Sequence, residues 1–224
     1  MNSIKVYVGN TSSLEDTALF EKLCKKVSSQ RLEKINRISR PEDKRLSLGA
    51  ELLLKKALSD IGVEIFEIDY IKNGKPCIKG DENLFFNLSH SGERVMCAVS
   101  SLEVGCDVEK IKPVNLKIAK RVFFENEYKA IAELSTENEQ QDMFFRLWTL
   151  KESFMKVTGL GMKLPLDSFS IDVSGTEIFV SQNVDKNTYY FKEFDLETAY
   201  KYSVCGLVND FDDVVNVDFR ELFI

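Results

Sequence analysis

Two long stretches of the chain carry apolar residues at helical spacing, and each is followed by short strand-like runs. The first spans residues 41–61, where Pro41 suits the first helical turn and Gly62 suits a helix end. Its apolar stripe is Leu46, Ala50, Leu54, Ala57 and Ile61. The second spans residues 139–157 and stops before Gly159 and Gly161. One long helix plus strands, occurring twice, predicts an α+β fold of two similar halves.

The remaining segments support a division near residue 103. In residues 1–103, we expect a first strand over 4–8, helices from Ser13 and over 31–37, and strands within 65–100, with Asn73-Gly74 as a hairpin turn. In residues 104–224, we expect a strand over 104–109, helices over 116–122 and 125–133, and strands over 168–173, 177–181, 188–194 and 201–207. The predicted domains are therefore residues 1–103 and 104–224.

Composition places the chain among ordinary globular proteins, with 224 residues, 44% hydrophobic and 29% charged. The five cysteines form no Cys-x-x-Cys pair, which favours reduced thiols and a cytoplasmic location. No apolar run predicts a signal peptide or a membrane helix. The net charge of −6 argues against nucleic acid as the main partner, but residues 22–56 hold 11 basic and 4 acidic side chains. Such a local excess can attract a small polyanion, or can be a solvated helix face.

Asp107 and Glu109 lie two residues apart on a predicted strand, so their carboxylates project from one face. Two such charges repel unless a cation neutralises them, and hard oxygen ligands favour Mg²⁺. The alternative is an exposed acidic strand end.

Glu152 and Lys156 share one face of the second long helix, within the segment from Trp148 to Lys156. One interpretation makes Glu152 a third magnesium ligand and Lys156 a phosphate ligand. The other is a helix-stabilising pair that contributes about 0.2–0.5 kcal/mol.

A third candidate group is the turn that contains Ser89 and His90, the only histidine. Its hydroxyls and amides suit an anion, whereas a Ser-His dyad is disfavoured because neighbouring strand residues point apart. Lys75 sits in the tight turn Gly74-Lys75-Pro76. Both groups could equally be plain surface turns.

Taken in order, these motifs resemble the Sfp-type 4'-phosphopantetheinyl transferases. The matching stretches are Gly74-Lys75-Pro76, Phe86 to Ser91, Val104 to Glu109, Phe123-Phe124 with Glu127, and Trp148 to Lys156. The resemblance runs from about residue 31 to about residue 170. It implies the 4'-phosphopantetheinyl transferase fold, with two halves related by a pseudo-two-fold axis in a monomer.

The resemblance also implies a role for each matching residue. The magnesium ligands would be Asp107, Glu109 and Glu152, and the residues of the coenzyme A site would be Arg31, Lys34, Arg45, Lys75, Ser89, His90 and Lys156. Coenzyme A is the implied substrate, and its phosphopantetheine group would pass to a serine of an acyl- or peptidyl-carrier protein. Fatty acid, polyketide and nonribosomal peptide pathways all use such carriers, and the sequence does not choose among them.

In this interpretation, magnesium and Lys156 offset the charge on the departing adenosine 3',5'-bisphosphate. Glu152 is the favoured base for the serine hydroxyl, with Glu127 or a metal-bound water as alternatives. A basic segment over residues 112–121, beside Phe123 and Phe124, could receive an acidic carrier, or could be a solvated helix face. The competing functions are a magnesium-dependent phosphohydrolase and a non-catalytic coenzyme A-binding module.

Overall fold

The computed structural model describes residues 3–71 and 73–222 of the chain. The first half contains β1 (Lys5–Asn10), η1 (Thr11–Glu15), α1 (Thr17–Cys24), α2 (Ser29–Arg37), α3 (Pro41–Ser59), β2 (Ile68–Tyr70), β3 (Pro76–Ile78), β4 (Phe85–Ser91) and β5 (Arg94–Ser100). From residue 104 onward, the chain contains β6 (Val104–Lys110), α4 (Leu116–Val122), α5 (Glu125–Ala132), α6 (Glu137–Val157), η2 (Gly161–Lys163), η3 (Leu166–Ser168), β7 (Ser170–Asp172), β8 (Phe179–Ser181), β9 (Tyr190–Glu193), β10 (Tyr200–Gly206) and β11 (Val215–Val217). None of the helices in these residues is both long and apolar enough to cross a bilayer.

The two halves repeat one order of elements. In each half a strand leads through helices to the longest one, then to a two-stranded hairpin, then to two further strands. The strands pair in the order β1-β5-β4 in the first half and β6-β10-β9 in the second, antiparallel throughout. The prediction of an α+β fold with two similar halves is confirmed.

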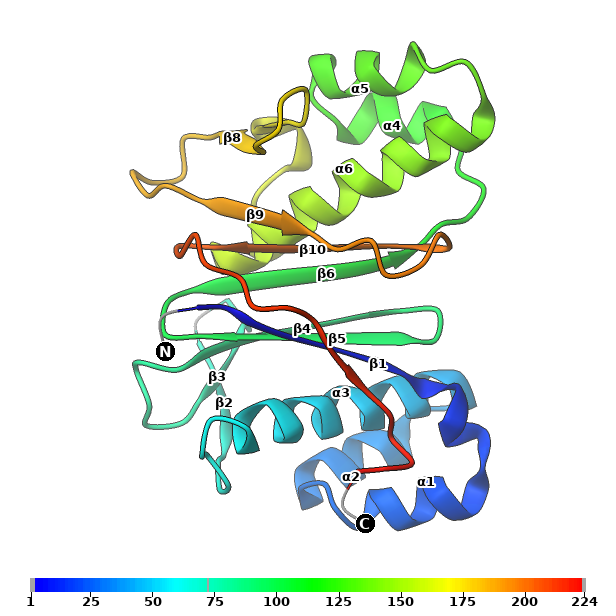
Figure 1. Ribbon diagram of the computed structural model, residues 1–224, viewed down its shortest axis with the longest axis vertical. Coiled ribbons are helices and arrows are strands. Elements are labelled where there is room, and N and C mark those ends of the chain that lie inside the picture. The colour runs from blue at the N-terminus through cyan, green and yellow to red at the C-terminus, as the bar shows by residue number, and fades with distance from the viewer. Residues whose placement is uncertain (1–2, 72, 223–224) are drawn as a thin grey trace.

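The halves stack so that the sheets face each other and the long helices lie outside. In Figure 1, α6 covers the outer face of the sheet β6-β10-β9, and α3 covers the outer face of the sheet that contains β1, β4 and β5. Between the sheets lies an apolar cluster that includes Val6, Met96, Val108 and Val204, all buried. Because every strand of this core alternates inward and outward residues, the other face of each strand is left for its helix.

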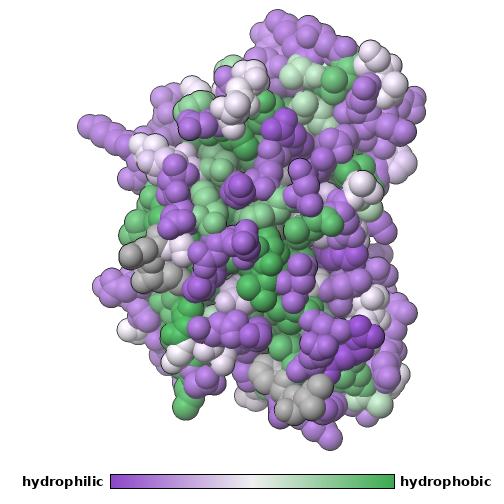
Figure 2. Space-filling view, viewed as in Figure 1, coloured by the Kyte–Doolittle hydropathy of each residue, from purple (hydrophilic) through white to green (hydrophobic). Residues whose placement is uncertain are grey.

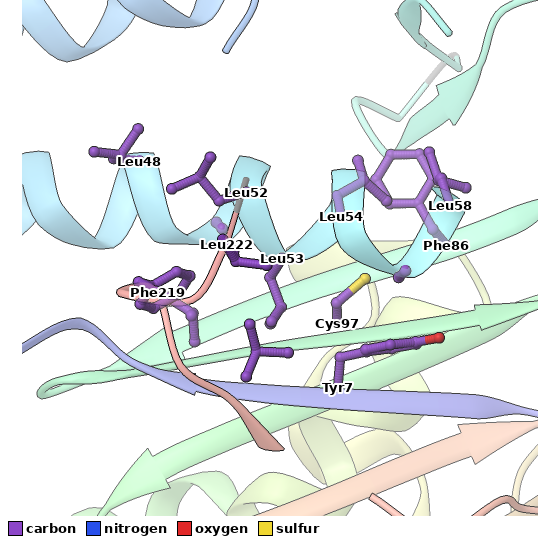
Figure 3. Close-up of a cluster of buried hydrophobic side chains, with 14 of the residues drawn as sticks. Tyr7, Leu48, Leu52, Leu53, Leu54, Leu58, Phe86, Cys97, Phe219 and Leu222 are labelled. Atoms are coloured by element: carbon purple, nitrogen blue, oxygen red, sulfur yellow. The ribbon is translucent and has the colours of Figure 1, made fainter. Parts of the chain in front are cut away.

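The core of the first half lies between α3 and its sheet. Figure 3 shows leucines of α3, among them Leu53, above Tyr7 of β1 and Cys97 of β5, with Phe219 and Leu222 close by. Tyr7 and Cys97 are cross-strand partners in the β1–β5 ladder, so they present one surface to the helix.

The C-terminal segment returns to the first half. The strand β11 pairs in parallel with β1 and extends that sheet at its edge. Phe219 and Leu222 are buried in the first core, as just described. Residues 104–224 therefore do not all lie in the second half, because the last strand gains its hydrogen-bond partners and apolar burial from the first.

Most predicted elements lie within a few residues of their predicted bounds. Pro41 occupies the first turn of α3, as predicted. The helix expected from Ser13 begins later, because Asp16 caps it by accepting hydrogen bonds from the backbone N–H groups of Ala18 and Leu19, and residues 11–15 form a 3-10 helix instead.

Candidate active site

Side chains of β4 join the two sheets at their edges. The backbone N–H of Cys106 donates to Asn87 Oδ1 at 2.9 Å, that of Val108 to Ser89 Oγ at 3.3 Å, and that of Lys110 to Ser91 Oγ at 3.2 Å. Alternate residues of β4 thus bond alternate residues of β6 at a constant offset, and each strand is an edge strand of its own sheet. We call Asn87, Ser89 and Ser91 the polar comb.

The same comb contacts the two predicted strand ligands. Ser89 Oγ donates to Asp107 Oδ1 at 2.7 Å, and Ser91 Oγ donates to Glu109 Oε2 at 2.6 Å. Asp107 is only 4% exposed, and its Oδ2 atom is buried with no hydrogen-bond partner in the described residues. A buried carboxylate oxygen without a donor is costly unless a cation reaches it, so Asp107 Oδ2 is suited to a ligand that the protein does not itself provide.

The helix α6 brings Glu152 and Lys156 to these carboxylates. Lys156 Nζ donates to Asp107 Oδ1 at 2.6 Å, to Ser89 Oγ at 3.0 Å and to the carbonyl oxygen of Cys106 at 3.0 Å. Burial disfavours the Lys156 ammonium, but the Asp107 carboxylate outweighs it, and the pKa of Lys156 is raised. The ammonium is therefore charged and already held in the junction between the halves.

Burial and neighbouring negative charge hinder the ionisation of both glutamates of the site. Burial raises the pKa of Glu109, and the negative charge of Asp107 adds to the effect. Burial likewise raises the pKa of Glu152, with further contributions from the charges of Asp107 and Glu109. Three carboxylates that share one electrostatic environment with one lysine leave negative charge that a cation would neutralise.

This donor set fits Mg²⁺ held jointly with a substrate. Among residues 3–71 and 73–222, no three Asp, Glu, His or Cys side chains stand close enough together to enclose a metal by themselves. Mg²⁺ is commonly bound by one or two carboxylates, with waters and substrate phosphates completing its shell, and does not need an all-protein cage. The oxygen donors and the unpartnered Asp107 Oδ2 satisfy that requirement.

Apart from Ser89 and Lys156, which lie at the carboxylates, the predicted coenzyme A residues fall into two groups. Three of the basic residues are engaged in ion pairs: Arg31 with Glu51 at 2.6 Å, Arg45 with Glu15 at 3.2 Å, and Lys75 with Glu103. Lys75 Nζ also donates to the carbonyl oxygens of Val104 and Val157, so it links the hairpin of the first half to the second half.

His90 and Lys34 form the second group, and both have exposed side chains. Desolvation lowers the pKa of His90, and the positive charge of Lys156 adds to this, followed by a smaller effect of Lys34. These interactions place His90 within the electrostatic reach of both lysines. Ser89 and His90 do not face the same partners, since Ser89 is buried against Asp107 whereas His90 is exposed.

A cavity of about 890 Å³ opens beside α2, between that helix and residues 64–70. Its lining includes Arg31, Lys34, Arg37, Phe66 and Tyr70. Two of the predicted coenzyme A residues thus line a space large enough for a nucleotide-sized ligand.

Glu127 occupies a structural position. Lys151 Nζ donates to both of its carboxylate oxygens at 2.7 Å, and the pair is completely buried. The backbone N–H groups of Phe124 and Ile171 also donate to Glu127, each at 2.7 Å. Every oxygen of Glu127 is therefore bonded inside the protein.

The residues missed by the sequence analysis are Lys151, Asn87 and Ser91. The available signal for the comb was a polar residue at every second position of β4, from Asn87 to Ser91. Nothing in the sequence indicated that Lys151, next to Glu152, points into the core and not into the site.

Comparison with known proteins agrees with the family that the motifs indicate. The profile of the 4'-phosphopantetheinyl transferase superfamily matches residues 103–205. The 4'-phosphopantetheinyl transferase Sfp of Bacillus subtilis (strain 168) is 33% identical over 222 residues, which is 97% of each chain. The 4'-phosphopantetheinyl transferase gsp of Aneurinibacillus migulanus is 36% identical over 210 residues, covering 92% of this chain and 86% of its own length.

These relatives extend over nearly the whole chain, so the similarity is not confined to one half. The prediction of an Sfp-type enzyme, made from the motifs alone, is confirmed. The chain belongs to the 4'-phosphopantetheinyl transferase superfamily and is a 4'-phosphopantetheinyl transferase of the Sfp type.

Proposed function

We propose that this enzyme transfers 4'-phosphopantetheine from coenzyme A to a serine of an acyl- or peptidyl-carrier protein, and that Asp107, Glu109 and Glu152 would supply carboxylate ligands to Mg²⁺, with substrate phosphates and waters completing its shell. The observation that carries the site assignment is the convergence of these residues with Lys156, from β6 and α6, at the junction with β4. In the reaction, the serine oxygen forms a bond to the β-phosphorus of coenzyme A. The bond from that phosphorus to the departing adenosine 3',5'-bisphosphate breaks.

The carboxylates supply oxygen ligands on one side of the site. When bound there, Mg²⁺ supplies positive charge to the pyrophosphate oxygens. Asp107 Oδ2 has no competing partner in the described residues, which favours it as a ligand atom.

Lys156 is the positively charged side chain that the protein contributes to the site. Its ammonium lies 2.6 Å from Asp107 Oδ1, and its side chain as a whole is 26% exposed. A charged group already held in place stabilises negative charge on the departing group without further reorganisation.

Glu152 is the base that takes the proton of the serine hydroxyl. Burial and then the charge of Asp107 raise the pKa of Glu152. A carboxylate with a higher pKa is a stronger base at neutral pH. Glu127 is unsuited to this role, because Lys151 and two backbone amides use both of its oxygens.

Coenzyme A would extend from this junction toward the cavity beside α2. His90 and Lys34 are the exposed members of the predicted contacts and would bind its 3'-phosphate. The ion pairs of Arg31, Arg45 and Lys75 support the walls of the site in this proposal.

The carrier protein would dock on α4 and the turn that follows it. Lys117, Lys120 and Arg121 give this segment positive charge for an acidic partner, and Ile118 and Phe124 are 47% and 44% exposed. Phe123, also considered for this surface, is buried in the second core and supports it from below.

Figure 2 shows that hydrophilic residues cover most of one face of the molecule, with hydrophobic residues emerging in places. Exposed apolar residues beside a basic helix are a feature to which an acidic partner can bind.

The decisive experiment is intact-protein mass spectrometry of an apo carrier domain after incubation with this enzyme, coenzyme A and Mg²⁺. We expect the carrier to gain one phosphopantetheine mass, and chelation of the metal to abolish the gain. Release of coenzyme A fragments without carrier modification would instead indicate a phosphohydrolase.

A further inference from the structure

The polar comb of β4 does more than join the sheets. Each of its serines bonds β6 twice, accepting from a backbone N–H and donating to the carboxylate of the preceding residue. Ser91 accepts from Lys110 N and donates to Glu109 Oε2, and Ser89 accepts from Val108 N and donates to Asp107 Oδ1. The backbone bond places each hydroxyl, so its proton has a defined direction.

The carboxylates and the hydroxyls come from different halves of the chain. Asp107 and Glu109 belong to β6 of the second half, and both serines belong to β4 of the first. A carboxylate on an edge strand would otherwise be free to rotate about its side-chain bonds, and ordering it on binding costs conformational entropy. Groups that hydrogen-bond a metal ligand orient it, and their removal commonly weakens metal binding about 10- to 100-fold.

We propose that Ser91 is a positioning residue of the metal site, which holds the Glu109 carboxylate in its binding orientation from the opposite half of the molecule. Ser89 acts in the same way on Asp107, but it also accepts from Lys156, so its replacement disturbs two groups at once. The inference rests on the proposed magnesium site. Its consequence is that metal affinity depends on the contact between the halves, in addition to the ligands themselves.

The test compares Ser91→Thr with Ser91→Val. The two side chains have nearly the same shape and both suit a strand, and only threonine keeps the hydroxyl. Mn²⁺ replaces Mg²⁺ because it prefers similar oxygen ligands and its free form is measured by electron paramagnetic resonance. Each variant is titrated with Mn²⁺ in the presence of coenzyme A and without a carrier protein, so no turnover occurs.

We expect Ser91→Val to bind Mn²⁺ about tenfold more weakly than the wild type and Ser91→Thr to bind it nearly as well. The control is Ser203→Ala, because Ser203 is a buried serine directly opposite Asp107 in the β6–β10 ladder and its hydroxyl has no partner in the described residues. Ser203→Ala should leave Mn²⁺ affinity unchanged. Thermal melts followed by circular dichroism establish that each variant is folded.

Equal Mn²⁺ affinity in Ser91→Thr and Ser91→Val would overturn the inference, and so would an equally large loss in Ser203→Ala. Asp107→Ala separates this failure from that of the proposed metal site. If Asp107→Ala loses Mn²⁺ binding while both Ser91 variants keep it, only the role of Ser91 is refuted. If Asp107→Ala binds Mn²⁺ as the wild type does, the metal site and the inference are both refuted.

Discussion

Gly105 of β6 lies directly against Ser153 of α6: a Cβ atom on Gly105 would stand 2.1 Å from the carbonyl oxygen of Ser153 and 2.5 Å from the backbone nitrogen of Val157. These contacts are backbone atoms, which cannot move aside as a flexible side chain can. The absence of a side chain at residue 105 is therefore what allows α6 to approach β6. Glu152 and Lys156 flank Ser153 on the same helix, so this contact sets their distance from Asp107.

Gly105→Ala should push α6 away from β6. We expect a loss of about 1–3 kcal/mol in the free energy of unfolding, as for other overpacked cores. Transfer should slow by up to about 100-fold, since misplacement of catalytic groups by about 1 Å has effects of that size. Urea denaturation and the carrier mass assay measure the two effects. Gly175→Ala is the control, because its Cβ would meet nothing nearer than 3.8 Å, and it should change neither quantity.

The Glu127–Lys151 pair should be a stability element. Removing one partner by Glu127→Gln or Lys151→Met should each cost about 3–5 kcal/mol of unfolding free energy, because the other group remains buried and less well compensated. The double variant should lose less than the sum of the two. On the same helix, Glu125→Gln removes the exposed pair of Glu125 with Lys129 and should change the unfolding free energy far less, because solvent screens that pair. A Glu127→Gln enzyme of unchanged stability and much lower rate would show instead that Glu127 takes part in the chemistry.

Glu152 should make stability depend on pH in a defined direction. Its pKa is raised in the folded protein, so the folded state retains the proton longer than the unfolded state does. Ionising Glu152 in the folded protein lowers the free energy of unfolding. This loss is absent below the ordinary glutamate pKa of about 4.3 and complete above the raised pKa of the folded state. Glu152→Gln lacks this loss and should be more stable than the wild type at neutral pH when metal is chelated. Urea unfolding across pH should show that advantage shrinking as the pH falls toward about 4. An advantage that stays constant with pH would contradict the assignment.

His90→Ala should impair use of the 3'-phosphate of coenzyme A. The histidine is exposed and lies within the electrostatic reach of Lys34 and Lys156, so its surroundings carry positive charge that favours a phosphate. We expect the apparent KM for coenzyme A to rise about tenfold or more, as for loss of a charged hydrogen bond, and that for 3'-dephospho-coenzyme A to change little. Steady-state kinetics with both substrates decide, and equal increases would exclude 3'-phosphate binding by His90.

Local sequence patterns correctly predicted the relative placement of candidate site residues that lie on the same strand or helix. Strand alternation put Asp107 and Glu109 on one face, and the structure places Val108 between them in the apolar cluster on the other. Helical spacing put Glu152 and Lys156 together, and both lie at the site. The predicted magnesium and coenzyme A roles of these residues remain predictions, to be tested as above.

Contacts between distant segments could not be read in the same way. The resemblance placed Arg31, Arg45 and Lys75 in the coenzyme A site, and their ion pairs were not foreseen because the acidic partners stand 20, 30 and 28 residues away in the sequence. Glu127 remained a candidate base because its partner Lys151 lies in the following helix, α6, adjacent to a site residue. Tertiary packing decides which charged residues form ion pairs. The periodic pattern of a sequence carries no information on these partners.

The sequence by itself determined the helices and strands, the repeat of the two halves and the family, because periodicity and motif spacing are properties of neighbouring residues. Only the tertiary structure decided how the halves meet: the polar comb of β4 on β6, the approach of α6 over Gly105 and the return of β11 to the first sheet. The site exists at that meeting because its carboxylates, its lysine and its hydroxyls come from three separate elements. Their free energy of interaction appears only when the elements are packed.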